Sequence, residues 1–171
     1  MTITIDLGRG YTTFIDDEDA DLAVENWRAI KCGHHPDYVT ACRQNHKAGK
    51  NTVTYLHRVI LGRKLGRALH AKEYTDHING NPLDNRRGNL RLATVSQNQA
   101  NRGKRIDNTS GFKGVFKNGK GWRAQICVNR KPICLGTRDT AEAAYELYVA
   151  AQQRYFGEFA NTGQEAEHEE A

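Results

Sequence analysis

The stretch YTDHINGNPLDNRRGNLRLATVSQNQANR, residues 74–102, decides how the middle of this chain folds. EYTDH (73–77) favours a short strand and LRLA (90–93) favours a second one. The residues between them, 78–89, are rich in Asn, Gly, Asp and Pro, which are typical of turns. TVSQ (94–97) has the pattern of a capping box, so a helix is expected directly after the second strand. The stretch therefore predicts a strand–loop–strand–helix unit that is too small for a core of its own.

Asp76 and His77 stand side by side at the end of the first expected strand. A carboxylate can bind a hard divalent cation such as Mg²⁺, and a neutral imidazole can accept a proton from water near pH 7. One carboxylate rarely holds Mg²⁺ by itself, so a side-chain amide oxygen is expected as a second ligand, and Asn98 in the helix can supply it. Asn85 and Asn89 can bind backbone groups and fix the loop. Isolated Asp-His pairs are common in proteins, so the spacing of the Asn residues is the main support for a catalytic role of this pair.

Together these residues resemble the ββα-metal (HNH) nuclease motif of phage- and intron-associated homing endonucleases. The resemblance rests on LHR (56–58), DHINGN (76–81), DNRRGNLR (84–91) and SQN (96–98). It implies that one divalent ion, Mg²⁺ or Mn²⁺, is held by Asp76 and Asn98. It also implies that His77 activates the attacking water and that Asn89 orients His77. The secondary candidates are Asn85 and His57, and His57 either takes part in catalysis directly or supports and packs beside the site.

Charge is distributed unevenly along the chain. The formal net charge is +5, but the residues from Arg43 to Lys131 hold 20 Lys and Arg against four acidic residues, whereas the remainder holds five against 16. A basic middle of this kind indicates a polyanionic partner. The arginines expected to bind phosphates beside the Asp-His pair are Arg86, Arg87, Arg91 and Arg102.

Residues 111–160 are expected to form a second compact unit. FKGVFK (112–117), WRAQICV (122–128) and PICLG (132–136) read as three strands, and an Asn-Gly pair between the first two is a strong hairpin signal. The segment 139–157 reads as a capped helix that ends at a glycine. Such a helix covers one face of a small sheet and leaves the other face open to solvent or to a ligand.

This second unit resembles the DNA-binding domain of the APETALA2/ethylene-response-factor family in FKGVF, GWRAQI, LGTRDTAEAAYELYVAA and FAN. The resemblance implies that the sheet lies in the major groove of double-stranded DNA. However, the alignment puts uncharged residues at several positions where the plant proteins carry Arg or Trp contacts: Gln125, Cys127, Pro132 and Cys134. The plant base-reading pattern therefore does not carry over. The residues expected to contact DNA here are Lys117, Arg123, Gln125 and Arg130.

The N-terminal residues 1–51 are less informative. DDEDADLAVENWRAI (16–30) has apolar spacing that favours a helix with an aspartate cap. A structural zinc site is possible from Cys32, His34, His35 and Cys42, but these residues lack C-x-x-C spacing, and reduced thiols in a cytosolic protein are favoured. No signal peptide is expected, since a basic region followed by an apolar block is missing. No apolar run approaches the roughly 18 residues of a membrane span.

We therefore expect an α+β protein with a small ββα-metal nuclease unit, followed by a three-stranded antiparallel sheet packed on one helix. The expected divisions are an N-terminal α/β segment (1–51), a nuclease domain (52–105), an APETALA2-type domain (106–162) and a disordered acidic tail (163–171).

The resulting hypothesis is a metal-dependent endonuclease that nicks or cuts double-stranded DNA at specific sites. It acts as a monomer in the cytoplasm of a bacterial or phage-infected cell, with no membrane partner and no small-molecule substrate. The alternative hypothesis is a non-catalytic, sequence-specific DNA-binding regulator. An RNA-processing role lacks the aromatic stacking motif of single-strand binders.

Overall fold

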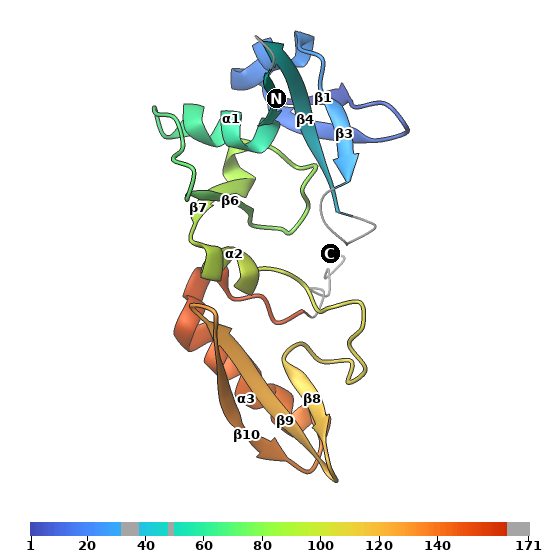
Figure 1. Cartoon of the computed structure of the whole chain (residues 1–171), viewed down its shortest axis with the longest axis vertical. Helices are drawn as coiled ribbons and strands as arrows, with labels where there is room; N and C mark the ends of the chain where they lie inside the picture. The colour runs from blue at the N-terminus through green and yellow to red at the C-terminus, as the bar shows by residue number, and fades with distance from the viewer. Residues whose placement is uncertain (32–37, 48–49, 164–171) are drawn as a thin grey trace. The chain divides into compact units, whose positions relative to one another are not determined.

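The structure, a computed structural model, describes residues 1–31, 38–47 and 50–163, and it confirms the α+β class (Figure 1). The chain divides into two compact units, Met1–Ala93 and Thr94–Ala171. Within the described part of the chain, every helix is too short or too polar to cross a lipid bilayer. The predicted acidic tail and the predicted zinc ligands Cys32, His34 and His35 lie outside the described residues, except for residue 163.

The first unit is built from antiparallel strand pairs around one short helix. In chain order its elements are β1 (Thr2–Asp6), β2 (Thr12–Asp16), the 3-10 helix η1 (Asp17–Val24), β3 (Arg28–Lys31), β4 (Val39–Lys47), β5 (Lys50–Tyr55), α1 (Leu56–Lys64), β6 (Tyr74–His77), the 3-10 turn η2 (Arg87–Asn89) and β7 (Leu90–Ala93). The sheets are β1–β2, β3–β4–β5 and β6–β7. Strand β5 runs directly into helix α1, and the two predicted strands of the Asp-His segment are confirmed.

One hydrophobic core joins the N-terminal segment to the Asp-His segment. Ile15 from β2, Ile60 from α1 and Leu90 from β7 are all fully buried in the same cluster. Helix α1 contacts β4, β5, β6 and β7, so it lies between the N-terminal strands and the β6–β7 pair. Residues 1–51 and 52–93 therefore fold against each other, which solves the problem that a strand–loop–strand unit has no core of its own.

The predicted N-terminal helix is wrong. Residues 17–24 form a 3-10 helix with a kink at Asp19, and the chain then turns so that Ile30 lies in strand β3, opposite Thr40. The physical reason is the Asp19 carboxylate, which is fully buried and held by the guanidinium groups of Arg63 and Arg87. A buried carboxylate tied to two guanidinium groups fixes the local backbone, and this tertiary contact overrides the apolar spacing.

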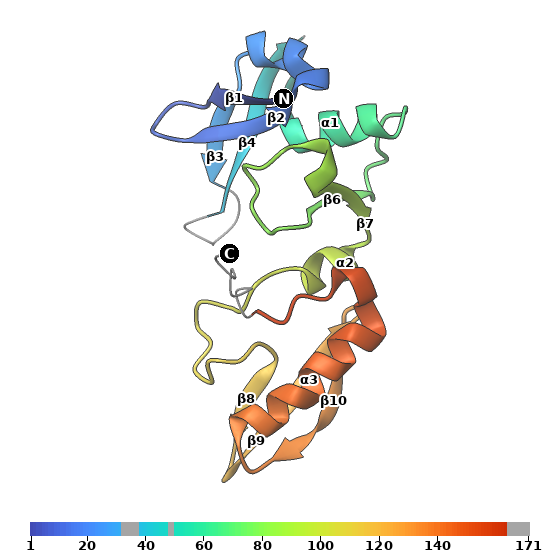
Figure 2. The same ribbon diagram turned by 180° about the vertical axis from the view of Figure 1, so that it is seen from behind.

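The second unit carries helix α2 (Val95–Ala100), strands β8 (Val115–Asn118), β9 (Gly121–Val128) and β10 (Lys131–Arg138), helix α3 (Ala141–Phe156) and the turn η3 (Gly157–Phe159). The strands form an antiparallel sheet in the order β10–β9–β8, and α3 packs on one face of it (Figures 1 and 2). Thr94 and Gln97 form the predicted capping box of α2, and Thr140 caps α3. The predicted three-stranded sheet with one covering helix is thus confirmed.

Burial alternates along β9 as predicted. Ala124 and Ile126 are buried on the α3 side, whereas Arg123 and Cys127 point to the open side and are exposed. At Gly114, φ is +74° and an added Cβ would lie 2.1 Å from the Tyr148 ring of α3, so only glycine allows β8 to approach the helix this closely.

Helix α2 is fastened to the second unit by polar contacts. The Lys113 Nζ donates to the carbonyl oxygens of Ala100, Arg102 and Asn161, over 2.6, 2.5 and 2.7 Å. The Asn129 amide in the β9–β10 turn donates to Ser96 Oγ over 2.9 Å. The bonds from Lys113 to Ala100 and Arg102 satisfy carbonyls at and just beyond the C-terminal end of a helix that is too short to be stable alone.

Candidate active site

Asp76 and His77 lie at the end of β6, as predicted, and both side chains are buried. Strand β6 pairs with β7 without a bulge, and Asp76 is opposite Arg91 while His77 is opposite Leu90. Successive side chains of a strand point to opposite faces. The Asp76 carboxylate and the His77 imidazole therefore contact different groups of residues.

The Asp76 carboxylate is held across the strand pair. The Arg91 Nε donates to Asp76 Oδ2 over 2.8 Å, and the two side chains are 13% and 3% exposed. Arg91 was predicted to bind phosphate, but in the structure its guanidinium group is engaged with the predicted metal ligand. This ion pair fixes the position of the Asp76 carboxylate on β6.

The His77 ring is enclosed by two side chains from other elements. Its Nε2 lies 3.3 Å from Asn85 Oδ1 in the β6–β7 loop, and the His57 ring of α1 packs edge-on at 5.4 Å between centroids. Burial lowers the pKa of His77 below its usual value of 6.5, so the ring is neutral at pH 7. A neutral imidazole is the form that can accept a proton.

His57, a secondary candidate, is a buried support for this ring. It stacks on Tyr55 at 5.5 Å, and its Nδ1 lies 3.3 Å from Thr40 Oγ1. Burial, followed by the nearby charges of His77 and Arg58, lowers the pKa of His57 to about 3. The ring therefore stays uncharged and contacts His77 by packing.

The loop between β6 and β7 is closed by asparagine side chains. The Asn89 Oδ1 accepts from the Asn79 amide, and the Asn89 Nδ2 donates to Asn79 Oδ1 and to the Asp84 carbonyl. The Asn89 carbonyl also accepts from the Ile78 amide, directly after His77. Asn89 thus fixes the backbone that follows His77, whereas Asn85 contacts the ring itself. The predicted orienting role of Asn89 stays a prediction.

Strand β2 holds the same loop from the N-terminal side. The Phe14 amide donates to the Leu83 carbonyl over 2.9 Å, and the Asn85 amide donates to the Phe14 carbonyl over 2.8 Å. The Thr13 hydroxyl, fully buried, donates to the Leu83 carbonyl and accepts from Asn85 Nδ2, each over 2.7 Å. No sequence signal predicted these contacts, because about 70 residues separate the partners.

The remaining loop arginines are paired with acids. Arg86 donates from two nitrogens to the Asp84 carboxylate, and this hydrogen bond lowers the pKa of Asp84. Arg87 pairs with Asp19 and with Glu18. The acidic N-terminus that the sequence separates from the basic middle therefore folds onto it and neutralises part of its charge.

A cage of protein ligands for a metal is not formed by the described residues, which contain no group of three or more His, Cys, Asp and Glu side chains suitably placed. One carboxylate with an amide oxygen still suits Mg²⁺, because this ion keeps several waters and often takes substrate phosphates as ligands. Asn98 lies half-buried in α2, in the second unit. Its pairing with Asp76 stays a prediction.

The predicted DNA contacts of the second unit are accessible. Arg123 and Gln125 lie on the open side of β9, and Arg130 lies at the β9–β10 turn with φ +65°. Lys117 stands over the Trp122 ring at 4.5 Å. Among the described residues, salt-bridge partners are missing for the exposed cations predicted in this unit: Arg102, Lys117, Arg123 and Arg130.

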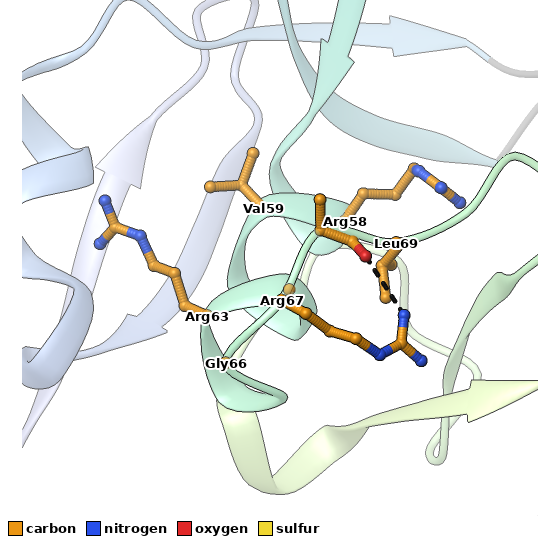
Figure 3. A pocket seen from close by; sticks show the side chains of 8 residues that line it. Arg58, Val59, Arg63, Gly66, Arg67 and Leu69 are labelled. Atoms are coloured by element: carbon orange, nitrogen blue, oxygen red, sulfur yellow. Dashed lines mark hydrogen bonds between the residues drawn. The ribbon is translucent and has the colours of Figure 1, made fainter.

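A hollow of about 470 Å³ borders α1 in the first unit, and Figure 3 shows the side chains that line it. Three arginines surround it, but each is engaged. Arg58 donates to the carbonyls of His70 and Glu73, Arg67 to the Glu73 carboxylate, and Arg63 to Asp19 and Asp21. The hollow therefore offers no uncommitted cation for a phosphate.

Three cysteines lie among the described residues. Cys42 is buried in β4, and Cys127 and Cys134 are exposed thiols on the open side of the second sheet, with no disulfide formed by any of the three.

A buried Asp-His pair on a two-stranded sheet, followed by an asparagine-closed loop, defines a site of the HNH nuclease class. A family model described as HNH endonuclease matches residues 54–100. An uncharacterized HNH endonuclease, L560 of Acanthamoeba polyphaga mimivirus, is 29% identical over 163 residues, which cover 90% of this chain and 76% of that protein. Protein 3.8 of Escherichia phage T7 is 36% identical over 89 residues, covering 51% of this chain and 73% of that protein.

The chain therefore belongs to the HNH endonuclease family. No solved structure matches it significantly. The family model covers α1 to α2 but not the N-terminal hairpin that contacts the loop.

Proposed function

We propose that this protein is a metal-dependent endonuclease that nicks double-stranded DNA at specific sites, as a homing-type enzyme. Membership of the HNH family implies nuclease activity on DNA. The observation that carries the proposal is the His77 ring, which burial keeps neutral beside the carboxylate-bearing residue Asp76.

In this proposal His77 accepts a proton from the water that attacks the scissile phosphorus. A new bond forms between the water oxygen and phosphorus while the bond to the 3′ oxygen breaks, and that oxygen leaves with the electron pair. Arg91 holds the Asp76 carboxylate in place, and Asn89 holds the turn that follows His77. One Mg²⁺ or Mn²⁺ ion would be held by Asp76 and Asn98, and it would there supply charge stabilisation for the phosphate and the leaving oxygen.

The second unit supplies DNA binding in this proposal. Its open sheet side carries Arg123 without a salt bridge to a described residue, and Gln125 beside it can donate and accept hydrogen bonds to base edges. The fold, a three-stranded sheet on one helix, agrees with the APETALA2-type domain that the sequence resembles. Reading by a sheet in the major groove is known for other DNA-binding proteins.

The experiment is cleavage of a supercoiled plasmid by the full chain with Mg²⁺, with Mn²⁺ or with EDTA. We expect open-circle product only with a divalent ion, and sequencing of the product ends gives site, strand and stagger. Tight sequence-selective binding without cleavage in any divalent ion would support the DNA-binding regulator instead. One active site per chain predicts nicks in one strand, and paired nicks with a fixed stagger would indicate a dimer.

A further inference from the structure

The open face of the second sheet carries side chains that are mostly uncharged. Val115, Ala124 and Ile126 are buried on the α3 side, so the residues that alternate with them along the strands point away from the helix. Figure 1 shows the sheet from this open side, and in Figure 2 helix α3 lies in front of it. The strand register places these residues on the open face: Phe116 of β8, Arg123, Gln125 and Cys127 of β9, and Pro132, Cys134 and Thr137 of β10.

Phe116 is the large apolar side chain of this face. It is 45% exposed, although it lies within a paired strand. Its register partner on β9 is Arg123, so the Cβ atoms of the two residues are neighbours about 5 Å apart. A partner that covers the phenyl ring would remove apolar surface from water and gain binding free energy.

The charges around the ring indicate that this partner is a polyanion. Arg123 is the charged residue of the open face, and further cations stand at the two ends of β9: Lys120 in the β8–β9 turn, and Arg130 and Lys131 at the β9–β10 turn. All four are exposed, and the salt bridges among the described residues involve none of them. The phosphates of double-stranded DNA supply the complementary charge.

The major groove is the part of the duplex that such a face can enter. It is about 12 Å wide and admits a two-stranded β-ribbon, whereas the minor groove is about 6 Å wide. Base pairs show hydrogen-bond donors and acceptors in the major groove, and one kind of apolar group, the C5 methyl of thymine. A phenyl ring placed over a polar base edge displaces water without replacing its hydrogen bonds. The thymine methyl is therefore the group against which the Phe116 ring can be buried favourably.

We propose that Phe116 contacts the C5 methyl group of a thymine in the major groove and is a specificity-determining residue of this protein. The inference rests on the proposed function, in which the open side of the sheet binds double-stranded DNA. Arg123 and the cations at the ends of β9 bind phosphates of any sequence, whereas the phenyl ring adds a preference for one base.

The test changes the methyl group and leaves the rest of the base intact. The full-length chain, in EDTA so that no strand is cut, first selects its preferred duplexes from a random-sequence pool. A selected duplex is then synthesised with thymine and, one position at a time, with deoxyuridine, which lacks the C5 methyl. Fluorescence anisotropy gives the Kd for each duplex.

Three variants accompany the wild type in these measurements. Phe116→Ala removes the ring, and Phe116→Leu keeps an apolar side chain. Tyr155→Ala is the matched control, since Tyr155 is an aromatic residue that is 42% exposed on helix α3, outside the sheet.

We expect deoxyuridine at one position to weaken wild-type binding about fourfold, the factor for burying one methyl group. Tyr155→Ala is expected to keep this factor and Phe116→Leu to keep part of it, whereas Phe116→Ala binds both duplexes equally. A full preference for thymine in Phe116→Ala overturns the proposal, and so does a wild type that binds the thymine and deoxyuridine duplexes alike. If Phe116→Ala fails to fold, the same comparison is made with Phe116→Leu, and an undiminished preference there overturns the proposal.

The outcome is separate from that of the nuclease experiment, because binding is measured without cleavage. Thymine preference in a protein that never cuts DNA would contradict the proposed nuclease activity and support the role of Phe116. Plasmid cleavage by a protein that binds all duplexes alike would support the nuclease activity and overturn the role of Phe116. Failure to bind any duplex would contradict both the DNA-binding role of the second unit and the role of Phe116.

Discussion

Arg91 and Asp76 face each other across the two strands of the active site, with the Arg91 Nε 2.8 Å from Asp76 Oδ2. The basic residue that sequence reasoning assigned to phosphate binding is thus the partner of the predicted metal ligand. The same strand pair holds the carboxylate in place and supplies the positive charge beside it.

Replacing Arg91 with Met is therefore expected to destabilise the metal-free protein. Removing one partner of a buried ion pair typically costs about 3 kcal/mol, because the remaining charge loses its compensation. A divalent cation bound at Asp76 restores positive charge, so Mg²⁺ or Mn²⁺ is expected to raise the melting temperature of Arg91→Met more than that of the wild type. Calorimetry with and without the ion measures both effects, and an equal ion-induced shift in the two proteins would contradict the account.

The buried ring of His57 predicts a pH dependence of stability. Its pKa in the folded protein is about 3, below the value of 6.5 for an exposed histidine. Between these values the unfolded chain binds more protons than the folded one, so the contribution of His57 to stability is complete above pH 6.5 and is lost as the pH falls toward 3. The slope is about 1.4 kcal/mol per pH unit. Urea titrations from pH 7 to pH 4 are expected to show this slope reduced in His57→Phe, which retains an aromatic ring but cannot titrate.

Asp19 and Asp21 allow a matched comparison, since both pair with Arg63. The Asp19 side chain is 0% exposed and also pairs with Arg87, whereas the Asp21 side chain is 65% exposed. Asp19→Asn is expected to lower the free energy of unfolding by about 3 kcal/mol, whereas Asp21→Asn is expected to lower it far less, because solvent screens an exposed ion pair. Chemical denaturation measures both, and equal losses would show that the N-terminal segment does not depend on this buried ion pair.

The salt dependence of DNA binding distinguishes the arginines of the two units. Arg123 is exposed and unpaired among the described residues, and its replacement by Ala is expected to reduce the salt slope of log affinity by about 0.9. Arg86 is bound to Asp84 by two hydrogen bonds, so Arg86→Ala is expected to leave the slope unchanged. Fluorescence anisotropy at several salt concentrations measures the slopes. A smaller salt slope for Arg86→Ala but not for Arg123→Ala would place the phosphate contacts in the β6–β7 loop.

Much of the fold followed from local sequence signals. The capping box at Thr94 and Gln97 and the alternation of β9 each depend on residues close in the chain, and both are confirmed. The helix predicted at 16–30 is wrong because Asp19 forms ion pairs with Arg63 and Arg87, which lie far along the chain.

The candidate site also has features that depend on local sequence and features that depend on contacts distant in the chain. Asp76 and His77 could be placed at the end of a strand because the motif is contiguous, and the second strand, β7, was predicted with them. Thr13 was missed, since a threonine in a hairpin has no distinguishing pattern and its contact to Asn85 spans 72 residues. Asn85 and Asn89 could not be separated by sequence, because only the folded loop shows which side chain reaches the ring.

The most direct test of the nuclease assignment is cleavage of supercoiled plasmid by His77→Ala with Mg²⁺ or Mn²⁺, beside His70→Ala as a control. His70 is an exposed histidine in the same unit. We expect His77→Ala to lose at least a hundredfold in cleavage rate, the usual contribution of a general base, while DNA binding and the melting temperature of the second unit stay as in the wild type. We expect His70→Ala to cleave normally. Cleavage by His77→Ala at the wild-type rate would contradict the assignment of His77 as the proton acceptor.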